Sequence, residues 1–311
     1  MGKPKTANYL YAVQPQEIQE ADLLNQFKTT KLGKTSQKQC AKKLTQWIQY
    51  IPEKTLTALI TQPDASLKYL ESASIKHSPS NHHIFISALI GYLTHVYPTS
   101  PHLDKWKRIQ KSNSEPLTEH YLDNKPTELQ KDKQIRYEEL IRTLNALEKG
   151  SFERLLIAFY TLIEPIRADY YATEIITDND HPTEENYIVV SETIATLYVN
   201  DFKTKQRYEA IKNTLSSHLY EELKESLKKY PRKYLFVMED NKPFTRKLFS
   251  NWACRTLTRV LKQPMTLTAL RHTFITYKRS MNTTKDELKE MAKNMGHSRG
   301  MQQAYEWISG M

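Results

Sequence analysis

Residues 296–308 of the chain read GHSRGMQQAYEWI, and the chain ends six residues after the tyrosine of this stretch. A glycine that follows a helical pattern often closes the helix, because it adopts a left-handed backbone that other residues avoid. We therefore expect Gly296 to end one helix and a short helix over 299–308 to carry Tyr305. His297 precedes Tyr305 by eight residues, so the pair forms a candidate site if other polar side chains meet it in space.

The composition favours a basic globular protein with two domains. The chain has 311 residues, of which 39% are hydrophobic, and this length is typical of two domains of ordinary size. A net charge of +10 and a pI near 9.3 favour nucleic acid as a partner, with solubility as the alternative explanation. No apolar run approaches the ~20 residues that a membrane-spanning helix needs, so no membrane partner is expected.

Cysteine and glycine usage excludes several classes of site. The only cysteines are Cys40 and Cys254, which argues against a disulfide framework or a cysteine-rich zinc site and fits an intracellular, reducing compartment. Neither GxGxxG nor GxxxxGK occurs, so the loops that bind the phosphates of ATP or NAD are missing. We expect no cofactor and no bound metal.

The first part of the chain predicts an N-terminal arm over 1–20 and a helical domain over 21–111. Residues 28–43 contain six lysines and no acidic residue. Apolar residues recur beside these lysines at the spacing of a helix with one buried face: Cys40, Leu44, Trp47, Ile48 and Ile51. On such a helix Lys34, Lys38 and Lys42 either contact a phosphate backbone or only face water.

A polar segment with two prolines, 112–133, is typical of a linker, and a second domain follows over 134–311. Gly150 is expected to stop a helix and Ser151 to cap the next one. Clustered β-branched and aromatic residues predict two or three antiparallel strands over 186–212 and a short strand at 234–238. Helical patterns cover the rest, near 213–229, 244–261, 267–280, 285–295 and 299–308. The predicted fold class is mainly α with a small antiparallel β-sheet.

Three more polar residues stand out by their context in this second domain. Arg167 lies in EPIRADYYATEI just past a helix, and Lys203 lies in the hairpin turn DFKTKQR. Arg271 lies in TALRHTF at the start of a helix with an apolar face. Taken singly, each has an ordinary structural explanation, as a surface arginine, a solvated lysine or a buried ion-pair partner. Together with His297 and Tyr305 they form an ordered pattern.

This pattern resembles the tyrosine recombinase and integrase family, which is related to type IB topoisomerases. The match covers about 134–311, with LRHTF and MGHS as its most specific parts, while 21–111 corresponds to a DNA core-binding domain by position and composition. The segments EPIRADY, FKTKQR and KYLFVMEDNKPFT resemble segments of recombinases from large DNA viruses, virophages and eukaryotic mobile elements. The resemblance implies a helical core-binding domain followed by a mixed α/β catalytic domain.

The same resemblance implies a function: metal- and ATP-independent cutting and rejoining of double-stranded DNA through a 3′-phosphotyrosyl intermediate. It further implies a dimer or tetramer on DNA, located in the nucleus, the cytoplasm or a viral compartment. Because the chain ends soon after Tyr305, it has no room for the C-terminal exchange helix of many recombinases, and the mode of assembly stays open.

The resemblance also assigns roles. Tyr305 would be the nucleophile, and Arg167 and Arg271 would hold the scissile phosphate, since guanidiniums stay charged and bind phosphate oxygens in pairs. A phenol with a pKa near 10 needs such a positive site to react at neutral pH. Lys203 would protonate the departing 5′ oxygen, with Lys205 in reserve, and His297 would orient the phosphate. Lys205 and Arg207 would also contact DNA.

The sequence departs from the family pattern at three places. Thr268 stands where a histidine is usual, and it cannot act as an acid or base near neutral pH. Tyr170, beside Asp169, stands where an acidic residue is frequent, and the spacing from His297 to Tyr305 is one residue short. Tyr277 and Tyr170 are alternative nucleophiles that lack a preceding Gly-His pair. A type IB topoisomerase or a catalytically silent DNA-binding relative remain alternative functions.

Overall fold

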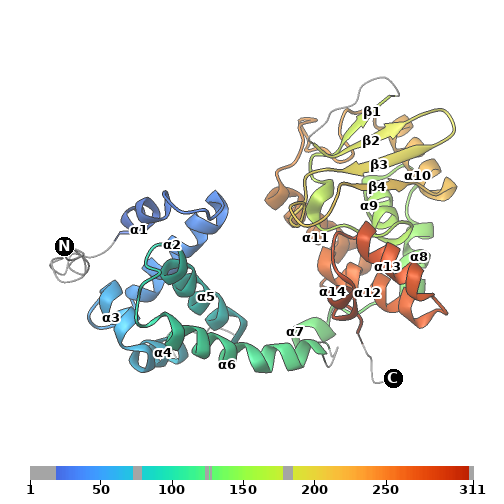
Figure 1. Cartoon of the computed structure of the whole chain (residues 1–311). Coiled ribbons are helices and arrows are strands. Elements are labelled where there is room, and N and C mark those ends of the chain that lie inside the picture. The colour runs from blue at the N-terminus through green and yellow to red at the C-terminus, as the bar shows by residue number, and fades with distance from the viewer. Residues whose placement is uncertain (1–18, 73–78, 123–125, 127, 178–184, 308–311) are drawn as a thin grey trace. The chain divides into compact units, whose positions relative to one another are not determined.

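The computed structural model describes residues 19–72, 79–122, 126, 128–177 and 185–307. The chain forms two compact units, Met1–Tyr121 and Leu122–Met311, and Figure 1 labels their helices and strands. The predicted fold class is confirmed in its main part, because helices dominate and one small sheet is present. The predicted arm falls outside the described residues up to residue 18, and a helix begins at Glu20.

The N-terminal unit is built from helices. Their bounds are α1 Glu20–Phe27, α2 Lys34–Ile48, α3 Leu56–Thr61, α4 Pro63–Glu71, α5 Pro79–His95 and α6 Leu103–Leu122. α2 packs against α1, α3 and α5. The predicted apolar stripe is confirmed, since Leu44, Trp47, Ile48 and Ile51 are all buried and Cys40 is partly buried.

Two tryptophans form the centre of this unit. The Trp47 ring lies edge-on to Trp106, with 5.6 Å between the ring centroids, and edge-on to Phe85. Both indole N–H groups donate to backbone carbonyls, at 3.1 Å from Trp47 to Ser66 and 3.0 Å from Trp106 to Ile60. Buried indoles need such acceptors, so these bonds tie α2 to α4 and α6 to α3.

The polar segment 112–133 is largely helical where it is described. α6 continues through it to Leu122, and the short α7 occupies Glu128–Lys131. The division between the two compact units, after Tyr121, lies inside this segment.

The C-terminal unit surrounds one buried helix, α9 (Phe152–Thr161). Residues 154–161 are all buried, and the Ser151 side chain caps the helix by accepting from the Arg154 N–H at 3.2 Å. Gly150, which precedes the cap, has a φ of +77°, as expected for a helix stop. The other helices are α8 Tyr137–Ala146, the 3₁₀ turn η1 Ala168–Tyr170, α10 Ser217–Lys229, α11 Arg246–Leu261, α12 Leu267–Ser280, α13 Lys285–Asn294 and α14 Arg299–Gln303.

Four strands form a mixed sheet in the order β1-β2-β3-β4, visible side by side in Figure 1. Their bounds are β1 Glu174–Ile176, β2 Tyr187–Val190, β3 Ala195–Val199 and β4 Ile211–Thr214. β2, β3 and β4 pair antiparallel, as predicted for 186–212. The sequence did not predict β1, which pairs parallel to β2 and makes the sheet mixed. β1 has only three residues, too few to give a detectable alternation of polar and apolar positions.

The strand predicted at 234–238 is wrong. Only isolated bridges occur there, Glu174 with Tyr234 and Val237 with Pro243. Leu235 and Phe236 are fully buried, so the apolar run reflects a loop that enters the core rather than a strand in a ladder. None of the helices in the described part of the chain is long and apolar enough to cross a membrane.

Candidate active site

Arg271 lies in the first half of α12 and is almost completely buried, with 1% of its surface exposed. The helix begins at a cap in which the Thr266 side chain accepts from the Ala269 N–H at 3.1 Å. The Nη1 group of Arg271 donates to the carbonyl of Pro165 at 2.8 Å, which ties α12 to the turn after α9. Nε and Nη2 have no partner among the described residues. A buried guanidinium with two free donors is suited to bind an anion.

Arg167 lies near Arg271, at the start of η1. Its backbone carbonyl accepts from the Tyr160 hydroxyl at 2.7 Å, so the turn is anchored to α9. The Arg167 side chain is half-buried and forms no hydrogen bond or ion pair with the described residues. Burial lowers the pKa of Arg271, and the positive charge of Arg167 lowers it further. The two guanidiniums are thus close enough to repel each other, an arrangement that an anion would stabilise.

The Gly296-His297 pair forms the turn after α13, as predicted. Gly296 has a φ of +66°, and the His297 N–H donates to the carbonyl of Ala292 at 3.1 Å. The His297 side chain is 3% exposed, and its Nε2 has no partner among the described residues. Burial, followed by the charges of Arg271 and Arg167, lowers the pKa of His297 to about 3, so its ring is neutral near pH 7. A phosphate beside the two arginines would offset their charge and raise this pKa.

The loop between β3 and β4 is fixed to this turn. The Thr204 hydroxyl donates to the carbonyl of Gly296 at 2.7 Å, and a Cβ at Gly296 would lie 3.1 Å from the Phe202 ring. Lys203 sits between these two anchors and is exposed, with no hydrogen bond or ion pair among the described residues. Lys205, in contrast, pairs with Asp201 at 2.8 Å. The fold therefore leaves Lys203, rather than Lys205, as the unpaired lysine next to the Gly-His turn, and Arg207 is exposed further along the loop.

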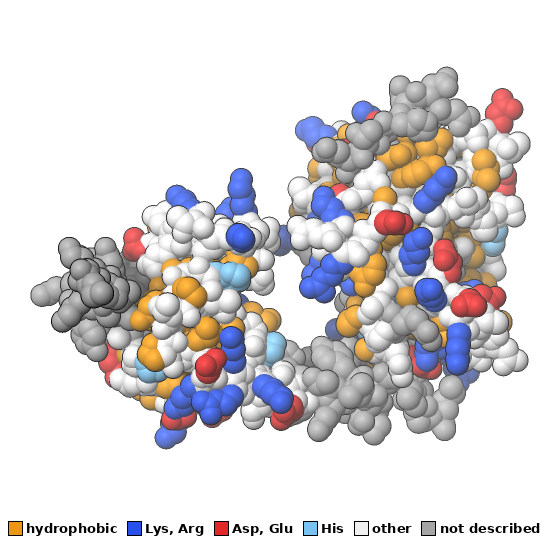
Figure 2. All heavy atoms as spheres, in the orientation of Figure 1, with side chains coloured by type: hydrophobic (Ala, Val, Ile, Leu, Met, Phe, Trp, Pro, Cys, Tyr) orange, Lys and Arg blue, Asp and Glu red, His pale blue; other side chains and the backbone are white. Residues whose placement is uncertain are grey.

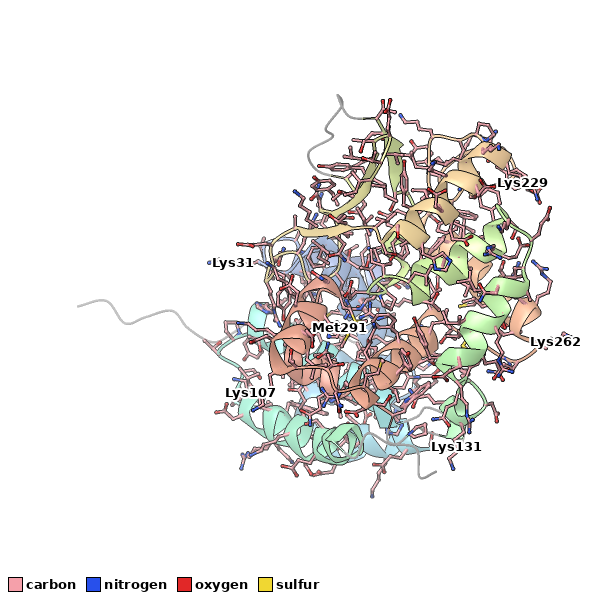
Figure 3. The ribbon with its side chains drawn as sticks, turned by 90° about the vertical axis from the view of Figure 1, so that its right-hand side faces the viewer. Lys31, Lys107, Lys131, Lys229, Lys262 and Met291 are labelled. Carbon is pink, nitrogen blue, oxygen red and sulfur yellow. The ribbon has the colours of Figure 1, made fainter. Side chains whose placement is uncertain are left out.

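The helix expected over 299–308 is shorter than predicted, because α14 ends at Gln303 and Tyr305 lies in the turn that follows it. The Tyr305 side chain nevertheless reaches the same place. The Arg271 guanidinium carbon lies 5.3 Å from the centroid of the Tyr305 ring, and the His297 and Tyr305 ring centroids are 5.6 Å apart. The ring packs against the small apolar cluster of α12 and α13 that contains Met291, which Figure 3 labels among the C-terminal helices. The Tyr305 hydroxyl has no hydrogen-bond partner in the described part of the chain.

The other tyrosines considered as nucleophiles have structural roles. Tyr170 is fully buried, with its hydroxyl 3.3 Å from the Phe159 carbonyl, and burial raises its pKa far above the usual range. The Tyr277 ring stacks on Tyr137 with 3.9 Å between centroids. Thr268 is exposed and forms no hydrogen bond within the described residues, so no contact ties it to the cluster around Tyr305.

The structure adds two groups whose roles were not predicted from the sequence. His272 stacks on the Tyr305 ring and donates from Nδ1 to the Tyr305 carbonyl at 2.7 Å. Asp169, which is 2% exposed, pairs with Arg246 of α11 at 2.5 Å. Burial raises the pKa of Asp169, and Arg246 opposes this shift. His272 directly follows Arg271 and Asp169 lies two residues after Arg167, so closeness in sequence to a motif arginine is the signal that could have indicated both.

The lysines predicted to contact DNA lie on the exposed face of α2. Lys34, Lys38 and Lys42 are four residues apart, so they form one row on the helix, opposite the buried Leu44 and Trp47. None of the three pairs with an acidic side chain of the described residues. Figure 2 shows lysine and arginine side chains on the visible faces of both units.

No family model matches the chain, and no curated protein matches it. In structure the chain is similar to the XerA recombinase, with a TM-score of 0.42 and 13% sequence identity over 94% of each chain. It is also similar to the XerH site-specific recombinase, whose structure is a pre-cleavage complex with its difH substrate. That match has a TM-score of 0.45 and 16% identity, and it covers 92% of this chain and 81% of XerH.

Proposed function

We propose that the chain is a site-specific DNA recombinase or integrase that cuts and rejoins DNA through a 3′-phosphotyrosyl intermediate. The observation that carries the proposal is the set of unpaired groups around Tyr305: two buried N–H donors of Arg271, the free side chain of Arg167 and the buried Nε2 of His297. The Arg271 donors are buried without an acceptor, which costs folding free energy, so they imply an absent anionic ligand. The Nδ1 of the neutral His297 ring lies 3.4 Å from the Ser298 carbonyl, so Nε2 would donate to that ligand only after the ring binds a proton.

The arrangement suits attack on a phosphodiester. Tyr305 would lose its phenolic proton to water, and its Oη would attack the phosphorus while Arg167 and Arg271 stabilise the charge that develops on the nonbridging oxygens. The bond from phosphorus to the 5′ oxygen would break, and Lys203 would supply the proton that this oxygen needs. The covalent link keeps the energy of the broken bond, so rejoining by the 5′ hydroxyl needs no metal or nucleotide.

The row of α2 lysines would bind the backbone of double-stranded DNA, which is the proposed partner. The protein would act in the compartment that contains this DNA. Recombination also requires several protomers on one DNA assembly, which we propose as a dimer or tetramer. A type IB topoisomerase would use the same cluster but needs only one protomer, and a silent DNA-binding relative would not need the cluster.

Cleavage of a nicked suicide substrate tests the proposal. The wild type should accumulate a protein–DNA adduct at a 3′ phosphate, and mass spectrometry should locate it on the peptide containing Tyr305. Tyr305→Phe should form no adduct yet bind DNA, because it loses one hydroxyl that has no hydrogen-bond partner among the described residues. Tyr277→Phe is the matched control and should cleave like the wild type.

Three outcomes would contradict the proposal. An adduct on another residue would reject Tyr305 as the nucleophile, and the absence of any adduct would favour the DNA-binding relative. Relaxation of supercoiled plasmid without strand exchange between two sites would favour the topoisomerase.

A further inference from the structure

The segment that carries Tyr305 has no regular structure of its own to hold it. α14 ends at Gln303, and residues 306 and 307 belong to neither a helix nor a strand. The position of the Tyr305 side chain must therefore come from contacts with another element. Residues 305–307 make turn bonds to residues 302 and 303. Every other hydrogen bond or ion pair of these residues within the described part of the chain is made with α12.

The first of these contacts is made by His272. Its Nδ1 lies 2.7 Å from the Tyr305 carbonyl, and because a carbonyl oxygen can only accept, Nδ1 must carry the proton. The imidazole also stacks on two rings of the segment. Its centroid is 4.6 Å from that of Tyr305, and 4.4 Å from that of Trp307 with 5° between the planes.

Further along α12, two more contacts hold the same segment. The Trp307 N–H donates to the Thr276 hydroxyl at 2.9 Å, one helical turn after His272. Arg279 pairs with Glu306 in the last turn of the helix. The residue before His272 is Arg271, whose guanidinium lies under the Tyr305 ring. One helix therefore presents both the phosphate-binding arginine and the contacts that set the place of the tyrosine.

From this arrangement we propose that His272 is a positioning residue, which holds the Tyr305 backbone and ring in register with Arg271 so that the phenol faces the bound phosphate. The inference rests on the proposed function for its chemical consequence, but the contact itself does not. Burial lowers the pKa of His272 to about 4, consistent with a neutral ring that donates from Nδ1 throughout the neutral pH range.

The test separates the two features of the imidazole. His272→Asn keeps an N–H near the place of Nδ1 and loses most of the stacking, whereas His272→Phe keeps the ring and loses the donor. In single-turnover cleavage at saturating DNA, His272→Phe should be slower than the wild type by about tenfold or more. His272→Asn should recover part of that loss. DNA affinity should stay unchanged in both variants, and the exposed His218→Asn should behave like the wild type.

A second measurement does not depend on catalysis. Hydrogen exchange in the free protein should show faster exchange at the Trp307 amide in His272→Phe than in the wild type, because the segment loses one of its contacts with α12. If His272→Phe does not fold, the cleavage rate and the Trp307 exchange rate of His272→Asn are compared with those of the wild type instead.

The outcomes separate the two proposals. Faster exchange in the variant, in a protein that forms no adduct with any DNA, would support the contact and reject the enzymatic function. Unchanged exchange and unchanged single-turnover rates, with only a lower melting temperature, would overturn the inference and leave His272 as a core residue.

Discussion

Arg271 has three guanidinium nitrogens, and only Nη1 has a partner among the described residues. The charge alone could be supplied by lysine, but the two free donors of the planar group could not. If they bind the scissile phosphate as a pair, the shape of the group matters as much as its charge.

Arg271→Lys tests this at the residue scale. The variant keeps the positive charge, so DNA binding should persist, but cleavage should fall on the order of 10²-fold because paired donors to the developing charge are lost. Arg167→Lys should show a loss of the same kind, and the exposed Arg255→Lys should not. Single-turnover cleavage at saturating DNA measures the effect. A rate near that of the wild type in Arg271→Lys would mean that only charge is needed there.

At this scale the sequence predicted the arginine, the histidine and the tyrosine that meet in space. Taken singly each residue had an ordinary explanation, and it was the resemblance to recombinases that grouped them; the local predictions that Gly296 closes a turn and that α12 is a helix are confirmed. His272 was not predicted, because its partners are a backbone carbonyl and two rings of a segment without regular structure. Such contacts leave no periodic signal in the sequence.

Among the elements, the loop between β3 and β4 has the clearest link to function. The Thr204 hydroxyl donates to the Gly296 carbonyl, and the Phe202 ring fills the space that a side chain at Gly296 would need, so the backbone at Lys203 is held beside the Gly-His turn. Any larger residue at Gly296 would meet the Phe202 ring and would also need a left-handed backbone. The loop and the Gly-His turn thus depend on each other.

DNA with a 5′-bridging phosphorothiolate tests the loop, since the sulfur departs without a proton. Lys203→Ala should cut ordinary DNA poorly and regain cleavage on this substrate. Thr204→Val, which removes the hydrogen bond to Gly296, should show a smaller loss with the same recovery. Lys205→Ala is the matched control, because Lys205 already pairs with Asp201. Recovery in Lys205→Ala instead of Lys203→Ala would transfer the proton-donor role to Lys205.

Helices were easier to predict than strands for a physical reason. α12 begins and ends as predicted because a Thr cap and a continuous apolar face mark it locally. The apolar run at 234–238 has the composition of a strand, but the Leu235 N–H donates to the distant Thr173 carbonyl, while the Met238 N–H donates locally to Lys242. β1 is equally dependent on distant residues, so neither outcome could be derived from local pattern.

At the scale of the whole molecule, the proposed function divides between the two units. The C-terminal unit contains every group of the site around Tyr305, while α2 of the N-terminal unit contributes the row of Lys34, Lys38 and Lys42. The row has no acidic neighbour within 28–43, and none of its members pairs with a carboxylate of the described residues. The row of lysines therefore contacts either DNA phosphates or only solvent.

The salt dependence of DNA binding distinguishes these alternatives. Each lysine that neutralises a phosphate adds about 0.9 to the slope of log affinity against log salt, so replacing all three with glutamine should reduce the slope by up to about three. The matched control replaces Lys224, Lys228 and Lys229 of α10, of which Figure 3 labels Lys229. Two of these already pair with Glu221 and Glu148, so the control should change the slope much less.

Cleavage of saturating DNA should remain in both triple variants, since neither touches the site. An unchanged slope in the α2 variant would mean that water, not phosphate, faces this row, and the DNA-binding surface would then have to be sought elsewhere in the N-terminal unit or on the C-terminal unit alone.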